Sequence, residues 1–248
     1  MSAIIANSKT ETLLHVRGEM LKPLAEGALW WAEHGVLIVS DLHLEKGSSF
    51  AVRGQMLPPY DTSATLTIVE ALMAELAPRM VISLGDSFHD GKAETRMSEA
   101  CTARVRALTA STDWVWVEGN HDPDPPAHLG GRAAKVLQMG ELVFRHEPTG
   151  DTGEIAGHLH PCARIAGKHR ALRRRCFVTD GCSLVMPALG AFTGGLNVLD
   201  EAFDSVFSGS ERMVFAMGKE DVFPVRRQRL REDGAGRDTG RWRIKSGG

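Results

Sequence analysis

Histidine, aspartate and asparagine residues gather in five short clusters of this sequence, and they are the residue types that bind metal ions. The chain contains ten histidines but only one tyrosine. Seven side chains in these clusters can each offer an oxygen or nitrogen atom to a metal. Seven ligands are too many for one tetrahedral ion, but they suit two divalent ions that share a bridging carboxylate. The mixture of carboxylate, amide and imidazole groups favours Mn²⁺, Fe²⁺ or Zn²⁺ over Ca²⁺ or Mg²⁺, which prefer oxygen ligands alone. The candidate ligands are Asp41, His43, Asp86, Asn120, His146, His158 and His160.

Each cluster follows a short apolar segment that is typical of a buried β-strand. In open α/β sheets, ligands bind where the strands end, because the loops converge there. Asp41 and His43 are separated by one residue, as are His158 and His160, so both members of each pair can point towards one centre. The predicted strands span residues 36–40, 80–84, 114–117, 141–144 and 154–156.

Helical segments alternate with these strands, which indicates an α/β domain. Helices are predicted over residues 61–77 and 93–108, and residues 41–61 are expected to form a polar loop. Residues 1–35 are expected to supply an early strand or two. Later strands over 176–179, 183–186 and 213–217 add a second β layer.

Length and composition are those of a globular protein. The 248 residues suit one domain with a tail, and 43% hydrophobic with 24% charged residues argue against a disordered chain. No apolar run approaches the ~18 residues of a membrane span, and the N-terminus lacks the pattern of a secretory signal. We therefore expect a cytoplasmic protein without membrane contact, whose four cysteines are reduced thiols. A single domain is predicted over residues 1–225, followed by a basic, disordered tail over 226–248.

The ordered motifs resemble those of the calcineurin-like metallophosphoesterases. Asp41-x-His43, Gly85-Asp86, Gly119-Asn120-His121-Asp122, His146 and Gly157-His158-x-His160 stand in the order of that superfamily. The resemblance implies a four-layer α/β fold, with two mixed β-sheets packed face to face and flanked by helices. It assigns Asp41, His43, Asp86 and His160 to one metal ion, and Asp86, Asn120, His146 and His158 to the other, so that Asp86 bridges them.

The reaction that this resemblance implies is hydrolysis of a phosphoester. Two ions ~3.5–4 Å apart activate a bridging water, orient the ester for in-line attack and neutralise the developing charge. His121 is not a ligand in the family pattern and is predicted to act as the general acid. His89, three residues past Asp86, resembles the extra histidine of the nuclease branch, which lies near the scissile phosphate. Alternatively, His89 only orients one of the metal ligands.

Longer stretches are similar to the bacterial ligase-associated metallophosphoesterases of the DNA-damage response. This resemblance covers residues 20 to 205 and implies a Mn²⁺-dependent phosphodiesterase that acts as a DNA endonuclease on single strands in DNA repair. Fe²⁺ and Zn²⁺ are the alternative metals. It also implies a functional association with a DNA ligase, an exonuclease and a helicase. The stretches are 41–50, 57–61, 85–90, 144–148, 154–161 and 190–197.

The charge distribution bears on a DNA substrate. The formal net charge is −2, but residues 164–175 carry six Lys or Arg and no acid, and residues 226–248 carry a net charge of +5. The first basic segment begins four residues after His160, so it could follow a phosphate backbone beside the site, or it could be a solvated turn. Substrate contacts are predicted for Arg173, Arg174 and Arg175 of this segment. Lys46 and Arg53, in the loop after Asp41, are further candidates.

Two other function classes share parts of this pattern. A phosphoesterase or pyrophosphatase for a nucleotide or lipid precursor would carry the same five metal motifs, and the basic segment and His89 disfavour it. A binding module that kept the fold without catalysis would be expected to lack a ligand or His121, and the sequence retains them all.

Overall fold

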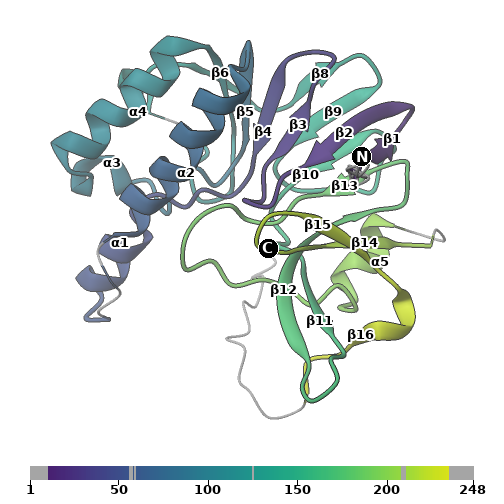
Figure 1. Ribbon diagram of the computed structural model, residues 1–248. Helices are drawn as coiled ribbons and strands as arrows, with labels where there is room; N and C mark the ends of the chain where they lie inside the picture. Colours follow the sequence, from purple (N-terminus) through teal and green to yellow (C-terminus); the bar gives the residue numbers. More distant parts are fainter. Residues whose placement is uncertain (1–10, 56–57, 59, 125, 208–210, 235–248) are drawn as a thin grey trace, which may run out of the picture.

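The computed structural model describes residues 11–55, 58, 60–124, 126–207 and 211–234 (Figure 1). Two β-sheets form the centre of the fold, and helices α1–α4 lie together on one side of the first sheet. The helices are α1 (Lys46–Val52), α2 (Asp61–Leu76), α3 (Ala93–Arg96), α4 (Glu99–Ser111) and α5 (Ala202–Val206), with short 3₁₀ turns at Ala127–Leu129 and Arg227–Arg229.

The first sheet has seven strands in sequence order, β1 to β7. Strands β1 to β4 pair antiparallel, whereas β4 to β7 pair parallel, so the sheet is mixed. The strands are β1 (Leu14–Val16), β2 (Glu19–Pro23), β3 (Leu29–Trp31), β4 (Val36–Val39), β5 (Met80–Leu84), β6 (Asp113–Val117) and β7 (Arg132–Ala134).

The second sheet has nine strands and is also mixed. Its main path runs β15-β14-β12-β13-β10-β9-β8, and β11 pairs with both β12 and β16 beside this path. The strands are β8 (Leu137–Met139), β9 (Leu142–Arg145), β10 (Glu154–Ala156), β11 (Cys162–Ile165), β12 (Leu172–Thr179), β13 (Leu184–Val185), β14 (Met213–Met217), β15 (Val222–Val225) and β16 (Leu230–Arg231).

Alternation along the central strands divides the apolar core into layers. In β4, Leu37 and Val39 pack under the helices, while Val36 and Ile38 face the second sheet. In β12, Phe177 faces the first sheet, whereas its neighbours pack on the far side against α5. Because successive strand residues point to opposite faces, an uninterrupted apolar run is what a strand between two apolar layers requires.

The predicted four-layer fold is confirmed. Three apolar interfaces separate four layers: helices α2 and α4, the first sheet, the second sheet, and an outer layer of which α5 is the described helix. This outer layer is thin. Its helix α5 has five residues, of which Phe203 and Val206 pack into the apolar core.

Several predicted elements differ from the observed ones. The loop expected over 41–61 contains α1, and the helix expected over 93–108 is split into α3 and α4. Met97 and Ser98 have extended backbones there, and the Ser98 hydroxyl accepts a hydrogen bond from the amide of Cys101, so a new helix starts. The early segment provides three strands instead of one or two.

The C-terminal boundary also needs correction. The predicted disordered tail begins at residue 226, but β16 pairs with β11 through Arg164↔Arg231 and Ile165↔Leu230. Leu230 is buried in the outer apolar layer, which explains why the chain returns to the sheet. Residues 235–248 of the predicted tail, and residues 1–10, lie outside the described residues.

No helix in the described part of the chain is both long enough and apolar enough to cross a membrane.

Candidate metal centre

The candidate ligands lie in loops that follow β4, β5, β6, β9 and β10, as the strand-end pattern predicts. The β4 and β5 loops are joined beyond the ends of the strands. The amide of His43 donates to the carbonyl of Asp86 at 2.9 Å, and the amide of His89 donates to the carbonyl of Leu44 at 2.9 Å. These bonds hold the loops of the first sheet against one another while the second sheet supplies the remaining histidines.

Five of the seven candidate ligands have left-handed backbones. Their φ angles are 52° at Asp41, 44° at His43, 45° at Asp86, 68° at His158 and 45° at His160. Such conformations are uncommon for residues with a side chain, although aspartate and histidine tolerate them better than most. They turn the chain sharply at the strand ends, and they gather at functional sites because the surrounding structure must hold them.

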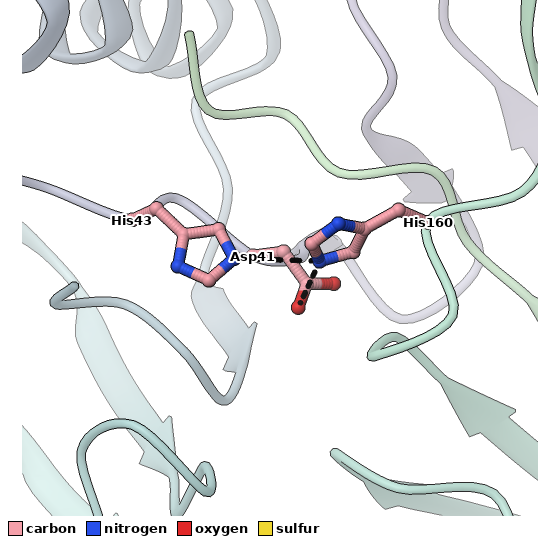
Figure 2. Close-up of side chains that lie close together, drawn as sticks. All are labelled: Asp41, His43 and His160. Atoms are coloured by element: carbon pink, nitrogen blue, oxygen red, sulfur yellow. Dashed lines mark hydrogen bonds and ion pairs between the residues drawn. The ribbon is translucent and has the colours of Figure 1, made fainter. Parts of the chain in front are cut away.

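Asp41, His43 and His160 form one half of the site (Figure 2). The Nε2 atom of His160 lies 3.0 Å from Oδ1 of Asp41, and the Nε2 atoms of His43 and His160 lie 3.4 Å apart. Nε2 of His43 also lies 3.9 Å from Oδ2 of Asp86. The donor atoms of the three residues lie within 4.8 Å of one another, a separation that a metal ion could bridge.

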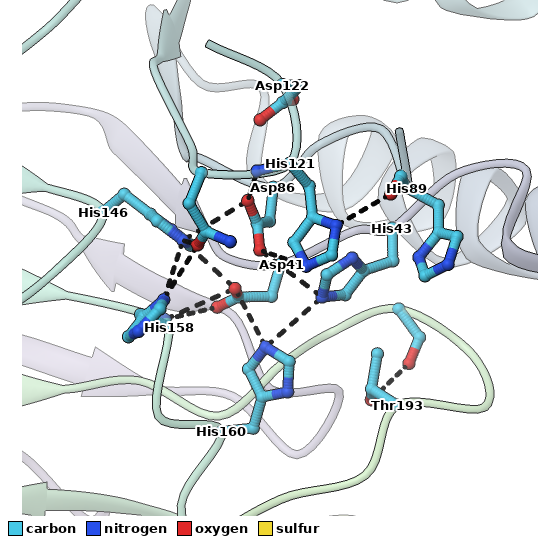
Figure 3. A network of polar contacts seen from close by, with 12 residues as sticks. Asp41, His43, Asp86, His89, His121, Asp122, His146, His158, His160 and Thr193 are labelled. Atoms are coloured by element: carbon cyan, nitrogen blue, oxygen red, sulfur yellow. Dashed lines mark hydrogen bonds and ion pairs between the residues drawn. The ribbon is translucent and has the colours of Figure 1, made fainter. Parts of the chain in front are cut away.

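His146 and His158, which Figure 3 labels, form the other half together with Asn120. Oδ1 of Asn120 lies 2.9 Å from Nε2 of His146 and 3.0 Å from Nδ1 of His158. Nε2 of His146 lies 3.3 Å from Oδ1 of Asp86. The two oxygens of Asp86 therefore face different halves, which is the arrangement that a bridging carboxylate needs. The carbonyl of Leu84, 2.9 Å from Nδ1 of His146, fixes the orientation of that ring.

The buried charges of the two halves influence one another. Burial alone raises the pKa of Asp41, but His160, His146 and His43 outweigh it and hold this pKa well below its usual range. Burial lowers the pKa of His43 to about 3, so its imidazole is neutral near pH 7. Burial also lowers the pKa of His146, but its hydrogen bond to Asp86 and the two carboxylates outweigh this and raise the pKa to about 9. The pair of carboxylates thus attracts positive charge into the centre.

These residues fit two divalent cations. They supply carboxylate, amide and imidazole donors, and two overlapping groups, Asp41 with His43 and His160, and Asp41 with Asp86 and His146, meet the spacing of a metal site. Gly157 lets the His158 loop approach Asp41 closely, because a Cβ atom on Gly157 would lie 2.4 Å from Oδ2 of Asp41. Ligand atoms of the same kind lie close together here, such as the Nε2 atoms of His43 and His160, and a metal ion bound between them would attract both.

His121 and His89 lie beside the centre and not within either half. The amide of His121 donates to Oδ1 of Asp86 at 2.9 Å, and its Nδ1 lies 2.9 Å from the carbonyl of His89. Nε2 of His121 lies 3.9 Å from Oδ2 of Asp86. The ring of His89 stacks on that of His121, with centroids 5.5 Å apart and planes 18° from parallel. Figure 3 shows His89 on the flank opposite His146 and His158.

The charges that act on His89 are mostly positive. Its side chain is buried, and its Nδ1 has no hydrogen-bond partner among the residues that the structure describes. Burial and the charges of Lys46 and His121 lower the pKa of His89 to about 4, so the ring is neutral at pH 7. The structure thus places a neutral imidazole against His121.

The predicted substrate-contacting cations occupy different places. Lys46 is buried at the start of α1, where burial lowers its pKa and the charges of Asp61, Asp41 and Asp86 partly compensate. Arg53 is exposed at the end of α1, and its charge acts on His89. These two cations therefore lie on the His89 side of the centre.

Arg175 has a structural task that the sequence did not indicate. Its guanidinium donates to the carbonyls of Ala188, Leu189 and Gly190 at 2.9, 3.2 and 3.0 Å. The amide of Gly190 in turn donates to the carbonyl of Asp41 at 3.1 Å. Through these bonds Arg175 supports the Asp41 loop, which is a different role from the substrate contact that the sequence predicts. Arg173 and Arg174 are exposed on β12.

Sequence reasoning missed two residues that support the site. Asp122 is buried, and its Oδ2 accepts a hydrogen bond from the amide of Phe88 at 3.0 Å, which ties the β5 and β6 loops together. Ser40 donates from its hydroxyl to Oδ2 of Asp41. Asp122 could have been predicted as a supporting residue, because it ends the Gly119–Asp122 motif. No feature of the sequence points to Ser40.

Comparisons with known proteins give a consistent result. A family model described as calcineurin-like phosphoesterase matches residues 34–180, and no curated protein matches the chain. Among solved structures, the chain is 28% identical to the nuclease MPE of Pseudomonas putida, with a TM-score of 0.66 over 87% of this chain and 100% of that one. A protein of unknown function from Aquifex aeolicus (14% identity, TM-score 0.36, 54% and 81% of the chains) and the phosphoesterase Yfce from E. coli (13%, 0.38, 75% and 95%) are more distant.

Proposed function

The chain belongs to the calcineurin-like phosphoesterase family and is a metal-dependent phosphoester hydrolase, and we propose that it cuts single-stranded DNA internally during DNA repair. The observation that carries a nucleic-acid substrate is the match to the nuclease MPE, which extends over the whole of that chain. The choice of DNA rests on the resemblance to the ligase-associated group. The longer motifs that resemble the ligase-associated group support the assignment to repair. On the same resemblance, we place the enzyme in the cytoplasm, where it acts alongside a DNA ligase, an exonuclease and a helicase.

The proposed cofactor is a pair of divalent cations, with Mn²⁺ preferred over Fe²⁺ and Zn²⁺. Asp41, His43, Asp86 and His160 would hold one ion, and Asp86, Asn120, His146 and His158 the other. Bound divalent cations supply Lewis-acid polarisation of the phosphoryl oxygens and lower the pKa of the attacking water. The donor set suits Mn²⁺, Fe²⁺ and Zn²⁺ alike. The preference for Mn²⁺ rests on the resemblance to the ligase-associated group.

His121 is the proposed proton donor to the leaving oxygen. The carbonyl of His89, 2.9 Å from Nδ1, accepts a hydrogen bond and so aims the opposite ring atom, Nε2, at the centre. Protonated Nε2 would give its proton to the departing sugar oxygen, which otherwise leaves as a poorly stabilised anion. The stacked ring of His89 keeps His121 from rotating away.

Lys46 and Arg53 are proposed to contact substrate phosphates on the His89 side of the centre. Lys46 lies close enough for its charge to act on Asp41, Asp86 and His89. A buried cation beside the centre attracts an anionic substrate. It offsets part of the repulsion that the carboxylates of the centre exert on a phosphate group.

The test offers four substrates to purified protein with Mn²⁺: circular single-stranded DNA, linear DNA, bis(p-nitrophenyl) phosphate, and nucleoside di- and triphosphates. Cutting of the circle is expected, and it requires endonuclease action because a circle has no ends. An Asp86→Asn variant is the control for contaminating nucleases and should leave the circle intact. Hydrolysis of only the nucleotides would refute the proposal and favour the small-molecule phosphoesterase.

A further inference from the structure

Strand β16 turns the β11–β12 hairpin into a three-stranded ribbon with a row of arginines. In the register of the ribbon, Arg164 lies directly opposite Arg173 on β12 and opposite Arg231 on β16. Residues directly opposite in antiparallel strands project from the same face. Arg173, Arg164 and Arg231 therefore stand side by side on one face, and we call them the arginine row.

The arginine row is costly in the protein alone. Like charges directly opposite each other destabilise a strand pair. The guanidinium groups donate to backbone carbonyls, Arg164 to Glu232 at 2.6 Å and Arg231 to Gln228 and Leu230 at 2.8 Å. Within the part of the chain that the structure describes, the carboxylate within ion-pair distance of the row is that of Asp233, 3.6 Å from Arg173. Three positive charges thus face one negative charge.

The arginine row lies on the face of the ribbon that leads to the metal centre. Arg175, two residues along β12 on the same face, is bonded to the segment that supports the Asp41 loop. Arg173 donates to the carbonyl of Gly195, and a Cβ atom on Gly195 would lie 2.1 Å from the carbonyl oxygen of His160. The row therefore starts beside the loop that packs against a predicted ligand.

The opposite face of the ribbon is occupied by the core. Leu230 is buried in the outer apolar layer, and Ile165 packs against it. Arg174 projects to that side, because its register partner is the buried Ala163, and it is exposed at the edge. The three row arginines are thus separated from Arg174 by the sheet itself.

We propose that the arginine row binds the phosphate backbone of the single-stranded DNA on one side of the scissile bond. This inference rests on the proposed function and extends it from the centre to the substrate path. Strands about 4.8 Å apart make the row roughly 10 Å long, enough for more than one phosphate of an extended strand. The planar guanidinium group suits phosphate oxygens, and three charges facing one carboxylate leave net attraction for a polyanion.

The test compares Arg164→Gln/Arg231→Gln with the wild type and with Arg174→Gln, the matched control on the other face. Binding of fluorescein-labelled dT20 is followed by anisotropy against salt concentration, with Mn²⁺ present and the His121→Ala substitution added to every protein to slow cleavage. Losing two phosphate contacts should lower the salt slope by about 1.4 and weaken binding roughly 10- to 30-fold at 0.1 M salt. Arg174→Gln should change binding less than twofold.

Two further measurements separate the row from the metal centre and from folding. Hydrolysis of bis(p-nitrophenyl) phosphate, measured with the His121 side chain intact, should be unchanged, because this small diester reaches only the centre. Arg231→Gln alone removes bonds only to carbonyls of nearby residues, so it tests the row if the double variant unfolds. The proposed DNA binding by the arginine row would be overturned if Arg231→Gln or the double variant bound dT20 as tightly as the wild type. It would also be overturned if the wild type did not bind dT20. Failure of the wild type to cut circular DNA, with dT20 binding still dependent on the row, would refute the proposed function alone.

Discussion

Replacement of Arg175 by methionine separates a structural role from a substrate-binding role. The guanidinium makes three contacts with the carbonyls of residues 188–190, two of them from one nitrogen. Ala188 and Leu189 are almost fully buried, so water cannot readily replace the lost donors. Methionine keeps most of the apolar stem and removes the charge and the hydrogen bonds.

The expected cost follows from these contacts. A hydrogen bond that involves a charged group contributes about 1.5–3 kcal/mol net, and the shared nitrogen reduces three contacts to about two independent ones. Arg175 is only partly buried, which favours the lower part of the range, about 3–4 kcal/mol of unfolding free energy. In a domain of this size, that loss corresponds to a fall in Tm of roughly 6–16 °C.

Differential scanning calorimetry with a matched control measures this effect. Arg174→Met changes the neighbouring arginine, which is exposed and donates to the carbonyl of Arg173. Its stability should stay within about 0.5 kcal/mol of the wild type. The Mn²⁺ concentration for half-maximal activity should also rise in Arg175→Met, because the supported segment is bonded to the backbone of Asp41. A Tm within 2 °C of the wild type together with weakened DNA binding would refute the structural role and restore the substrate-binding one.

Three other predictions concern the centre and the thiols. His121→Ala should lower turnover by about 10²–10⁴-fold while the Mn²⁺ content, measured by plasma emission, stays that of the wild type; loss of metal would contradict its role as proton donor. Chelator-treated protein should regain about 2.7 kcal/mol of stability when Mn²⁺ is added at 100 times its Kd, and Asp86→Asn should lose most of that gain in a thermal melt; a wild-type gain in the variant would remove Asp86 from the ligand set. Cys182 is exposed, whereas burial raises the pKa of the Cys176 thiol, so iodoacetamide followed by mass spectrometry should label Cys182 in the native protein and Cys176 only after unfolding. Equal labelling rates would place Cys176 outside the core.

The strands and the strand-end clusters could be predicted because their signal is local. The predicted strands 80–84 and 213–217 coincide with β5 and β14. A strand buried on both faces needs an apolar residue at nearly every position, whatever its neighbours are. The polar residues that follow stand out for the same reason. The short helix α1 could not be identified in this way, since its residues Lys46–Val52 lack an apolar stripe.

The contacts of Arg175 and the place of β16 depend on distant parts of the chain. Because side chains alternate between the two faces of a strand, the sequence could have placed Arg173 and Arg175 on one face and Arg174 on the other. It does not indicate which of these faces meets the carbonyls of residues 188–190. Likewise, Leu230 stands among polar residues and becomes buried only because β11 offers a free edge. Ser98 is different: a serine before Glu99 is an N-cap signal, and the break between α3 and α4 could have been predicted from it.

The left-handed backbones of the site have an evolutionary consequence. A residue with a side chain loses roughly 1 kcal/mol or more in this conformation, whereas glycine adopts it freely. Five of the nine non-glycine residues with positive φ in the described ranges are predicted ligands. His43→Gly should therefore melt at or above the temperature of the wild type in metal-free buffer, although it would be inactive. In a duplicate copy released from selection for activity, glycine could spread at His43 with no loss of folding, whereas at Asp41 and Asp86 it would leave the amides of His158 and His121 without their acceptors. The ligand positions would then change before the core, and the active site would be lost from a protein that still folds.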